Sequence, residues 1–450
     1  MSIRKTLVVC LAGLVSAPAH AGSDNEFLLQ EIRRLSERVA QLEAERSGVA
    51  AEGSPSLATR LAQIESQIGA MQKPVERLGA LQEIAAEAAL TLVAQNALSG
   101  EVSGSQSQAN YRADIEVSLP GGKIGHAEGR LFAHLRLGQG KGLALAQPSY
   151  TATPNSTVFE LHDGDSAALL AQAWYQLTLP LGEDPSDAPA RLAFTVGKLD
   201  PFIFFDQNAI ADNETSAFLN HAFVHNPMLD SGGDVGVDLH GFSPGIHLAY
   251  RQPGQHTDYW QASLGLFGSG HGASFDGSFD KPFVIGQLEA GHGLIAGLSG
   301  TYRLYAWTNG RATAYDGVTV ERRSGWGASV DQEVARHITL FARYGHSSQG
   351  RVRFDRAFTL GAEFSGSAWG RADDRLGLAA GWLKTSDGYR AADPDGYGPS
   401  GTERLAELYY AWRLNDQLEL SPDLQWIGRP GGNGAARDLI VVGLRAKASF

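Results

Sequence analysis

The sequence is poor in sulfur and has no long apolar segment beyond its first residues. Its 450 residues include one Cys and three Met. The 13 His residues are scattered, without an HExxH motif or the paired His/Cys spacing of zinc sites. A phosphate-binding Walker loop is also missing, and 268–272 is a glycine-rich turn. A membrane-spanning helix would need about 20 consecutive apolar residues, and none follows the N-terminus. We therefore expect a protein that is not an enzyme, with no cofactor and no metal site, and no helical membrane protein.

The charge balance is acidic, with 37 basic and 49 acidic residues and a formal net charge of −12. This balance argues against nucleic acid as a partner. The chain is rich in Gly, Tyr and Trp, with 54, 13 and 8 residues respectively, and its mean hydropathy is −0.18. Transmembrane β-barrels combine these properties because their apolar residues alternate with polar ones. A soluble all-β protein would have a similar composition.

Residues 1–21 have the pattern of a secretory signal peptide. Arg4 and Lys5 form a basic region, residues 7–15 form an apolar core, and Ala19-His20-Ala21 matches a cleavage site. The alternative is a buried first helix. Because Cys10 lies in the apolar core, the processed protein would lack cysteine. An exported protein without disulfides needs another source of stability, which a closed hydrogen-bonded barrel provides.

Residues 22–84 carry a heptad pattern that predicts a periplasmic α-helical coiled coil. Two runs of apolar residues recur with 4,3 spacing: Leu28, Ile32, Leu35, Val39 and Leu42, then Leu57, Leu61, Ile64, Ile68, Met71, Val75 and Leu78. Pro55 suits the start of the second helix, and Pro74 would kink or end it. Two arrangements remain open: a stalk that makes a homo-oligomer, or a helical hairpin within one chain. Binding of the segment to the cell wall would make it an envelope tether.

From about residue 85 to residue 450 the apolar pattern changes to period two, which predicts the strands of an all-β transmembrane barrel. Sixteen strands are expected, near 86–97, 110–119, 129–138, 170–179, 191–198, 245–251, 258–267, 283–290, 299–309, 324–331, 338–346, 357–365, 375–384, 403–412, 416–427 and 438–450. Counting from the periplasm, this set makes the periplasmic connections short and the external ones long, as in bacterial barrels. Omitting 86–97 would invert the pattern.

Alternation also predicts which strand residues face the lumen. The expected pore-lining residues are Arg130, His134, Arg136, Arg303, Trp307, Arg343 and Glu407. As a set they would create a transverse field, and the alternative is ordinary wall hydration or ion-pair bracing. Trp307 is a possible stacking surface for a sugar, whereas Trp382 and Trp412 are expected to face lipid.

The last segment alternates clearly and ends in an aromatic residue. Six residues from Ile440 to Phe450 share one face, and Arg445 and Lys447 lie on the other. A terminal aromatic residue resembles the signature of bacterial outer-membrane barrels, which makes the barrel-assembly machinery an expected partner through Phe450. The expected surroundings are outer-membrane lipid and the outer membrane of a Gram-negative bacterium.

The stretch 197–227 combines carboxylates and phenylalanines without a regular period. It lies in the longest predicted connection, 199–244, and we expect this loop to fold into the lumen as a constriction. Sugars require planar hydrogen-bonding groups for their hydroxyls and flat apolar surfaces for their C–H faces. The predicted permeant-contacting residues are Phe204, Phe205, Asp206, Asn208, Asp212, Asn213 and Glu214. The alternative is that the polar groups cap turns and fix the loop to the wall.

Four segments resemble the carbohydrate-selective porins of the OprB type: 110–142, 169–182, 194–223 and 420–433. Their shared order across the predicted barrel makes the likeness strong, whereas the heptad segment departs from the simplest members. The resemblance implies a sixteen-stranded porin that admits glucose and related sugars by facilitated diffusion. The alternatives are a general or ion-preferring porin, and a structural role in oligomerisation or envelope tethering.

Overall fold

The computed structural model describes residues 84–159, 165–182, 190–229, 241–254, 258–270, 277–295 and 297–450. The predicted signal peptide, and all but the last residue of the predicted coiled coil, lie outside these residues. No helix within the described residues is both long enough and apolar enough to cross a membrane.

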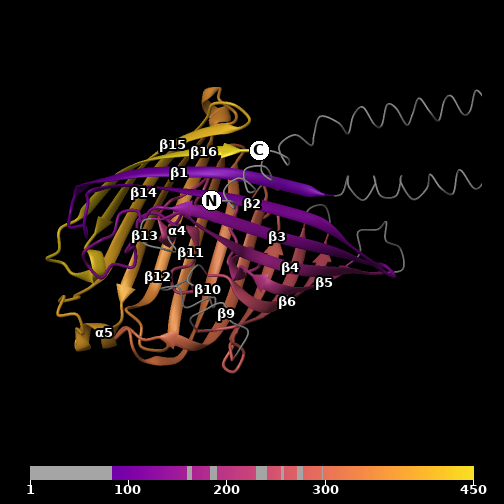
Figure 1. The fold of residues 1–450 in the computed structure, drawn as a ribbon, viewed down its shortest axis with the longest axis horizontal. Helices are drawn as coiled ribbons and strands as arrows, with labels where there is room; N and C mark the ends of the chain where they lie inside the picture. Colours follow the sequence, from indigo (N-terminus) through magenta and orange to yellow (C-terminus); the bar gives the residue numbers. More distant parts are fainter. Residues whose placement is uncertain are drawn as a thin grey trace, which may run out of the picture. The chain divides into compact units, whose positions relative to one another are not determined.

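The described residues form sixteen antiparallel strands that close into one barrel, with every strand hydrogen-bonded to its chain neighbours and β1 paired with β16 (Figure 1). The strands are β1 (Ala85–Ser99), β2 (Ser107–Ile124), β3 (Ala127–Gln139), β4 (Ala167–Leu181), β5 (Ala190–Leu199), β6 (Ser243–Pro253), β7 (Tyr259–Phe267), β8 (Phe283–Gly291), β9 (Gly300–Thr313), β10 (Val320–Ala335), β11 (Ile338–Gln349), β12 (Phe354–Ser365), β13 (Arg375–Thr385), β14 (Thr402–Arg413), β15 (Leu418–Gly428) and β16 (Leu439–Ser449). The predicted barrel and its sixteen strands are confirmed.

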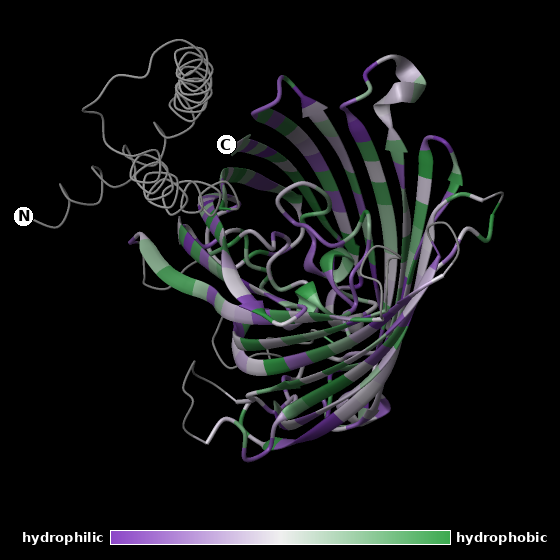
Figure 2. Cartoon of the chain, turned by 90° about the vertical axis from the view of Figure 1, so that its right-hand side faces the viewer, coloured by the Kyte–Doolittle hydropathy of each residue, from purple (hydrophilic) through white to green (hydrophobic). Residues whose placement is uncertain are grey.

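Side chains alternate between the outside and the lumen along each strand, as period-two patterning requires. On β3, Leu131 is 44% exposed on the outside and His134 is buried inside. On β9, Leu304 is 55% exposed and Arg303 is buried. Trp382 and Trp412 are on the outside, which confirms their predicted direction. Figure 2 shows the resulting stripes of opposite hydropathy along the strands.

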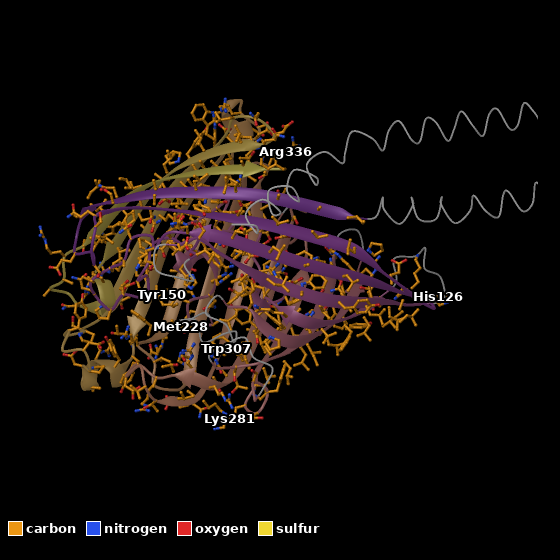
Figure 3. The ribbon with its side chains drawn as sticks, in the orientation of Figure 1. His126, Tyr150, Met228, Lys281, Trp307 and Arg336 are labelled. Atoms are coloured by element: carbon orange, nitrogen blue, oxygen red, sulfur yellow. The ribbon has the colours of Figure 1, made fainter. Side chains whose placement is uncertain are left out.

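The two ends of the barrel differ in the length of their connections. At one end, residues 125–126 join β2 to β3, and 336–337 join β10 to β11. At the other end, residues 140–166 and 200–242 join β3 to β4 and β5 to β6. Figure 3 shows Arg336, from a short turn, on the opposite side from Lys281 of a longer connection. Short turns mark the periplasmic end of bacterial barrels, so the long connections are extracellular. Because β1 is the first of the sixteen strands, it fixes which end of the barrel receives the short connections and which receives the long ones.

Of the five short helices found among the described residues, four lie in connections at the extracellular end or inside the lumen. They are η2 (Pro201–Ile203), α4 (His221–Val224), α5 (Asp387–Ala392) and η4 (Pro430–Gly432), whereas η3 (Gly366–Trp369) lies at the periplasmic end. Figure 2 shows connecting segments crossing the interior of the barrel. Residues 200–229 of the β5–β6 connection are called the constriction loop below.

Candidate pore constriction

The constriction loop contains two turns that are fixed by side chains of the loop itself, one at its start and one in its second half. The Asp200 carboxylate accepts a hydrogen bond from the Phe202 amide at 2.9 Å and begins η2. The Asn220 side chain accepts one from the Ala222 amide at 3.1 Å and begins α4. Asp and Asn are favoured at such positions because they satisfy amides left free at a helix start. These turns give a stretch without periodicity a defined path.

Asp206 joins the loop to three strands of the barrel wall. Its carboxylate accepts hydrogen bonds from the Tyr305 hydroxyl at 2.5 Å and from Arg343 Nε at 3.2 Å, and its amide donates to the Gln287 side chain at 2.9 Å. Its second carboxylate oxygen accepts from the Asn226 amide at 2.5 Å. The backbone of Asp206 is left-handed, with φ of 58°. Such a conformation is costly for a residue other than Gly, and these bonds compensate for it.

Glu407 and Arg445 hold the second half of the loop. One Glu407 oxygen accepts from the Leu219 amide at 2.5 Å and the other from the Asn220 amide at 2.9 Å. Arg445 donates to the carbonyls of Ala217 at 2.6 Å and Glu214 at 3.0 Å. Hydrogen bonds to charged groups are stronger than neutral ones. The loop backbone is therefore anchored to the Glu407 carboxyl group on β14 and to the Arg445 guanidinium on β16.

Phenylalanines of the loop fill the lumen behind these polar contacts. Phe205, Phe218 and Phe223 are each at most 1% exposed. Phe218 meets the Tyr409 ring edge-on at 5.0 Å and lies 5.7 Å from the Phe341 ring. Complete burial of such a side chain stabilises the folded loop by roughly 1.5–3 kcal/mol. The loop and wall thus share one apolar core inside the barrel.

The β3–β4 connection also enters the lumen. The Pro154 carbonyl accepts hydrogen bonds from the side chains of Gln95 at 2.8 Å and Gln425 at 2.9 Å. The Ser156 amide donates to the Leu219 carbonyl at 2.8 Å, which joins the two connections. Sequence reasoning treated this connection only as an external loop. Its inward path narrows the same space that the constriction loop narrows.

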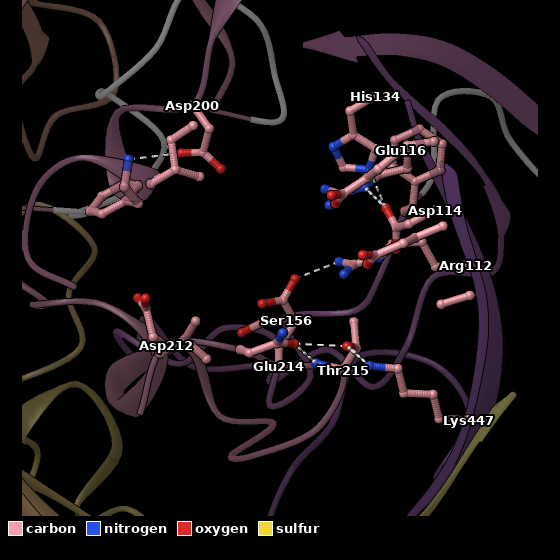
Figure 4. A pocket seen from close by; sticks show the side chains of 18 of the residues that line it. Arg112, Asp114, Glu116, His134, Ser156, Asp200, Asp212, Glu214, Thr215 and Lys447 are labelled. Carbon is pink, nitrogen blue, oxygen red and sulfur yellow. Dashed lines mark hydrogen bonds and ion pairs between the residues drawn. The ribbon is translucent and has the colours of Figure 1, made fainter. Parts of the chain in front are cut away.

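A cavity of about 970 Å³ remains between the loop and strands β2 and β3 (Figure 4). Its polar and charged lining on the wall includes Arg112, Asp114, Glu116, His134, Arg136 and Lys447. On the loop side, the lining includes Asp200, Gln207, Asp212, Asn213, Glu214 and His225. Apolar lining is contributed by Phe159, Phe202 and Phe242, among others.

The wall side of the cavity is a network of alternating charges. Arg112 donates to Asp114 at 2.8 Å and to Glu214 of the loop at 2.6 Å. The second oxygen of Asp114 lies 2.8 Å from both Arg136 Nε and His134 Nε2. Contacts to shared carboxylates of this kind set the direction of each guanidinium. The network presents rigid donors and acceptors to the cavity.

Carboxylates face this network from the loop (Figure 4). Burial raises the pKa of Asp200. Burial also raises the pKa of Asp212 to about 8, although Arg343 and His225 act in the opposite direction. Burial alone would raise the pKa of Glu214 too, but Arg112 and Arg136 hold it at about 2. The lining therefore contains a permanently ionised carboxylate beside one that is mostly protonated at neutral pH.

Aromatic rings form a further part of the lining. The Phe202 and His225 rings stack with centroids 3.7 Å apart. The Arg136 guanidinium lies 5.2 Å from the centroid of the Phe242 ring. Flat rings beside fixed hydrogen-bonding groups suit a ligand with both C–H faces and hydroxyls.

Five predicted site residues come together in this cavity: His134, Arg136, Asp212, Asn213 and Glu214. The other loop residues do not. Phe205 is 1% exposed, Asp206 is 0% exposed and Asn208 is 5% exposed. The Asn208 side chain donates a hydrogen bond to the Val330 carbonyl. Phe204 stacks on His247 with ring centroids 4.1 Å apart. These four residues lie outside the cavity lining, and the buried side chains of Phe205, Asp206 and Asn208 fix the loop to the wall. Their contact with the permeant stays a prediction.

The remaining strand residues face the lumen, where Arg303, Trp307, Arg343 and Glu407 are buried and Arg130 is exposed. Arg343 and Glu407 hold the loop, as described above. Arg303 is enclosed by Glu289 and Asp331, each at 2.7 Å. Trp307 is only 4% exposed and therefore offers no face to a sugar. Arg130 donates to Ser118 near the periplasmic end and does not line the cavity.

Sequence reasoning missed Arg112, Asp114 and Asp200, among others. Arg112, Asp114 and Glu116 alternate along β2, so the same period-two pattern that located His134 and Arg136 could have found them. Phe202 and His225 carry no such signal, because their stacking depends on the path of an irregular loop.

A closed sixteen-stranded barrel with a charged constriction formed by an inward loop defines an outer-membrane porin. The model of the carbohydrate-selective porin, OprB family, matches residues 133–450, and the chain belongs to this family. Porin B of Pseudomonas aeruginosa is 27% identical over 149 residues, a match that spans 28% of this chain and about a third (33%) of that protein's length. The fold is similar to a high-pH structure of Pseudomonas putida OprB, with a TM-score of 0.66, 16% identity, and coverage of 82% of this chain and 94% of that one.

Proposed function

We propose that this porin conducts small neutral saccharides, glucose and related sugars among them, into the periplasm by passive diffusion. The observation that carries the proposal is the cavity between β2–β3 and the constriction loop. It places the Arg112–Asp114–Arg136 network opposite Asp200 and Asp212. Paired donors and acceptors replace water around sugar hydroxyls, and the nearby rings accept C–H faces. Family membership supports the same substrate class.

Bilayer recordings with a series of sugars test this function. The reconstituted protein should conduct ions, and added sugar should block the current in a saturable manner. A conductance that stays unchanged across the sugar series would contradict sugar selectivity.

The charged lining also favours a second candidate, an ion-preferring or general porin. Arg112, Lys447 and Glu214 border the same cavity, and rings of charge select ions by sign. This candidate is distinguished by reversal potentials under a salt gradient: strong charge preference without sugar block supports it.

We further propose the division predicted from the sequence: a signal peptide at 1–21, a periplasmic coiled coil at 22–84 and the porin barrel at 85–450. Sequencing the N-terminus of the membrane-extracted protein tests the cleavage after Ala21. Cross-linking of the processed protein, with and without 22–84, tests whether that segment forms a homo-oligomer. A peptidoglycan pull-down tests the tethering role.

Recognition of Phe450 by the barrel-assembly machinery is a further proposal. Phe450 is 71% exposed, and its amide donates to the Ala88 carbonyl at 2.8 Å at the seam between β1 and β16. A Phe450→Ser change should lower the amount of assembled barrel, whereas Phe279→Ser in an extracellular connection should not. Equal amounts of both would count against the proposal.

A further inference from the structure

The lipid-facing side of the barrel carries a group of cations at the extracellular ends of three neighbouring strands. Arg356 lies on β12, Lys384 on β13 and Arg404 on β14, and together they are called the outer cationic row. Each lies an even number of residues from an exposed apolar residue on the same strand, so the two share one face of the sheet. These apolar residues are Phe358, Trp382 and Leu408. The Arg356 side chain is 51% exposed. All three therefore face away from the lumen.

Strand register brings the outer cationic row together. Arg356 is paired with Lys384 across β12 and β13. Lys384 is paired with Thr402, and Arg404, two residues further along β14, is its diagonal neighbour. Directly paired residues have Cβ atoms about 5 Å apart, and diagonal ones about 7–8 Å apart. Figure 1 shows the three strands side by side. The three residues are therefore neighbours on the outer face of the sheet.

The row lies at the edge of the apolar band. The Phe358 and Trp382 rings, one strand position deeper, stack with centroids 6.1 Å apart. Trp382 is paired with Arg404 across β13 and β14. Aromatic residues collect at the membrane–water interface, so the row is level with the headgroups of the outer leaflet.

Within the described residues, the protein itself supplies little compensating charge. The one acidic contact is Asp355, whose carboxylate is 4.0 Å from Arg356 Nε. Nearby loop carboxylates pair elsewhere: Asp387 with Arg390, and Asp395 with Arg353. Like charges placed opposite each other destabilise a sheet. Three clustered cations on a chain with a net charge of −12 therefore suit an external anion.

We propose that the outer cationic row binds the phosphate groups of lipid A, the glycolipid anchor of lipopolysaccharide, in the outer leaflet. Guanidinium groups bind phosphate in a bidentate manner and Lys binds it as a point charge. The acyl chains of the same molecule would lie against Phe358, Trp382 and Leu408. The outer cationic row and the apolar residues beside it thus match a ligand that carries phosphate and acyl chains on one molecule. The proposal does not depend on sugar passage through the lumen.

Native mass spectrometry of the detergent-solubilised full chain tests the proposal, with bisphosphorylated lipid A as the probe. The variant R356Q/K384Q/R404Q should bind it at least tenfold more weakly, because each basic residue near an anionic lipid surface contributes roughly fivefold. The control K123Q/R191Q/R336Q removes two Arg and one Lys at the periplasmic end and should bind normally. Monophosphorylated lipid A should bind the unaltered chain more weakly.

Heat-modifiable migration on gels shows that each variant has folded, and sugar block should be the same in all of them. Equal lipid A binding by the two triple variants would overturn the proposal. Phosphatidylglycerol bound as tightly as lipid A would also overturn it, because the site would then be a general anionic-lipid surface.

Discussion

Asp212 combines a position at the cavity with an unusual environment. Its side chain is 28% exposed and lies 3.9 Å from Arg343. Because burial raises the pKa of Asp212 to about 8, the group is mostly neutral at pH 7 and becomes charged above pH 8. The charge of the constriction therefore changes near pH 8 through Asp212. Glu214 stays ionised at this pH because its pKa is about 2.

We predict that cation preference rises between pH 7 and pH 9, and that Asp212→Asn abolishes this rise. A unit charge about 5 Å from a permeating ion changes its energy by roughly 1 kcal/mol in a well-hydrated site, or about fivefold in relative permeability. Reversal potentials across a salt gradient measure the change. Asp316→Asn is the control, because hydrogen bonds from Thr319 and Val318 lower the pKa of Asp316 to about 2. A pH-dependent rise that persists in Asp212→Asn would contradict the assignment.

Arg112 links the wall of the barrel to the constriction loop through Asp114 and Glu214. We predict that Arg112→Gln increases cation preference and weakens sugar block, because it leaves two carboxylates with less compensation and removes a fixed donor. Bilayer recordings with and without sugar measure both effects. Arg437→Gln also removes one positive charge, but in an exposed extracellular connection. It should change neither the cation preference nor the sugar block.

At the scale of elements, the constriction loop depends on space left by the strands it crosses. A Cβ atom at Gly345 of β11 would collide with Asn226 and would lie 2.7 Å from Met228 Cβ. A Cβ atom at Gly327 of β10 would lie 2.7 Å from the side-chain Nδ2 of Asn226. Gly in a strand often marks a place where another part of the chain approaches closely, and here that part is the side chains of the loop. The sequence of the wall is thus fitted to the path of the loop.

We predict that Glu407→Ala loosens the loop without unfolding the barrel. The change leaves the amides of Leu219 and Asn220 without their acceptors, which costs about 1–3 kcal/mol for each buried group. Hydrogen exchange of residues 215–224 should therefore be faster by roughly tenfold or more. The matched control is Glu321→Ala, a strand carboxylate that pairs with Arg351 at the surface. Unchanged exchange in Glu407→Ala would remove this anchoring role.

At the scale of the whole molecule, the barrel is a closed hydrogen-bonded unit. The pairing of β1 with β16 leaves no free edge among the described strands. Closure satisfies the backbone groups that would otherwise lie unpaired in lipid. This closure involves β1 from Ala85 onward, and all sixteen strands lie within residues 85–449.

We therefore predict that a processed chain lacking 22–84 folds and conducts. Single-channel conductance and sugar block should match those of the full chain, since the lining residues that the structure describes lie between Glu87 and Phe450. Loss of the heptad segment should change only the oligomeric state in cross-linking. A barrel that fails to show heat-modifiable migration without this segment would contradict the prediction.

Period-two alternation determined the barrel, its sixteen strands and the direction of their side chains. The reason is physical: lipid on one side and a polar lumen on the other impose opposite requirements on successive residues. His134 and Arg136 were found in this way, and Arg112 could have been. The same local rule cannot tell a lumen residue at the pore surface from one covered by a loop, as Arg343 and Trp307 demonstrate.

The path of the constriction loop was decided only by tertiary structure. Asp206 and Asp212 have the same chemistry and lie six residues apart, yet Asp206 is fully buried against Tyr305 and Arg343 whereas Asp212 faces the cavity. Contacts across 99 and 137 residues make this difference. The sequence by itself specified a barrel with an acidic, aromatic loop, and the packing of that loop against distant strands selected the side chains that line the pore.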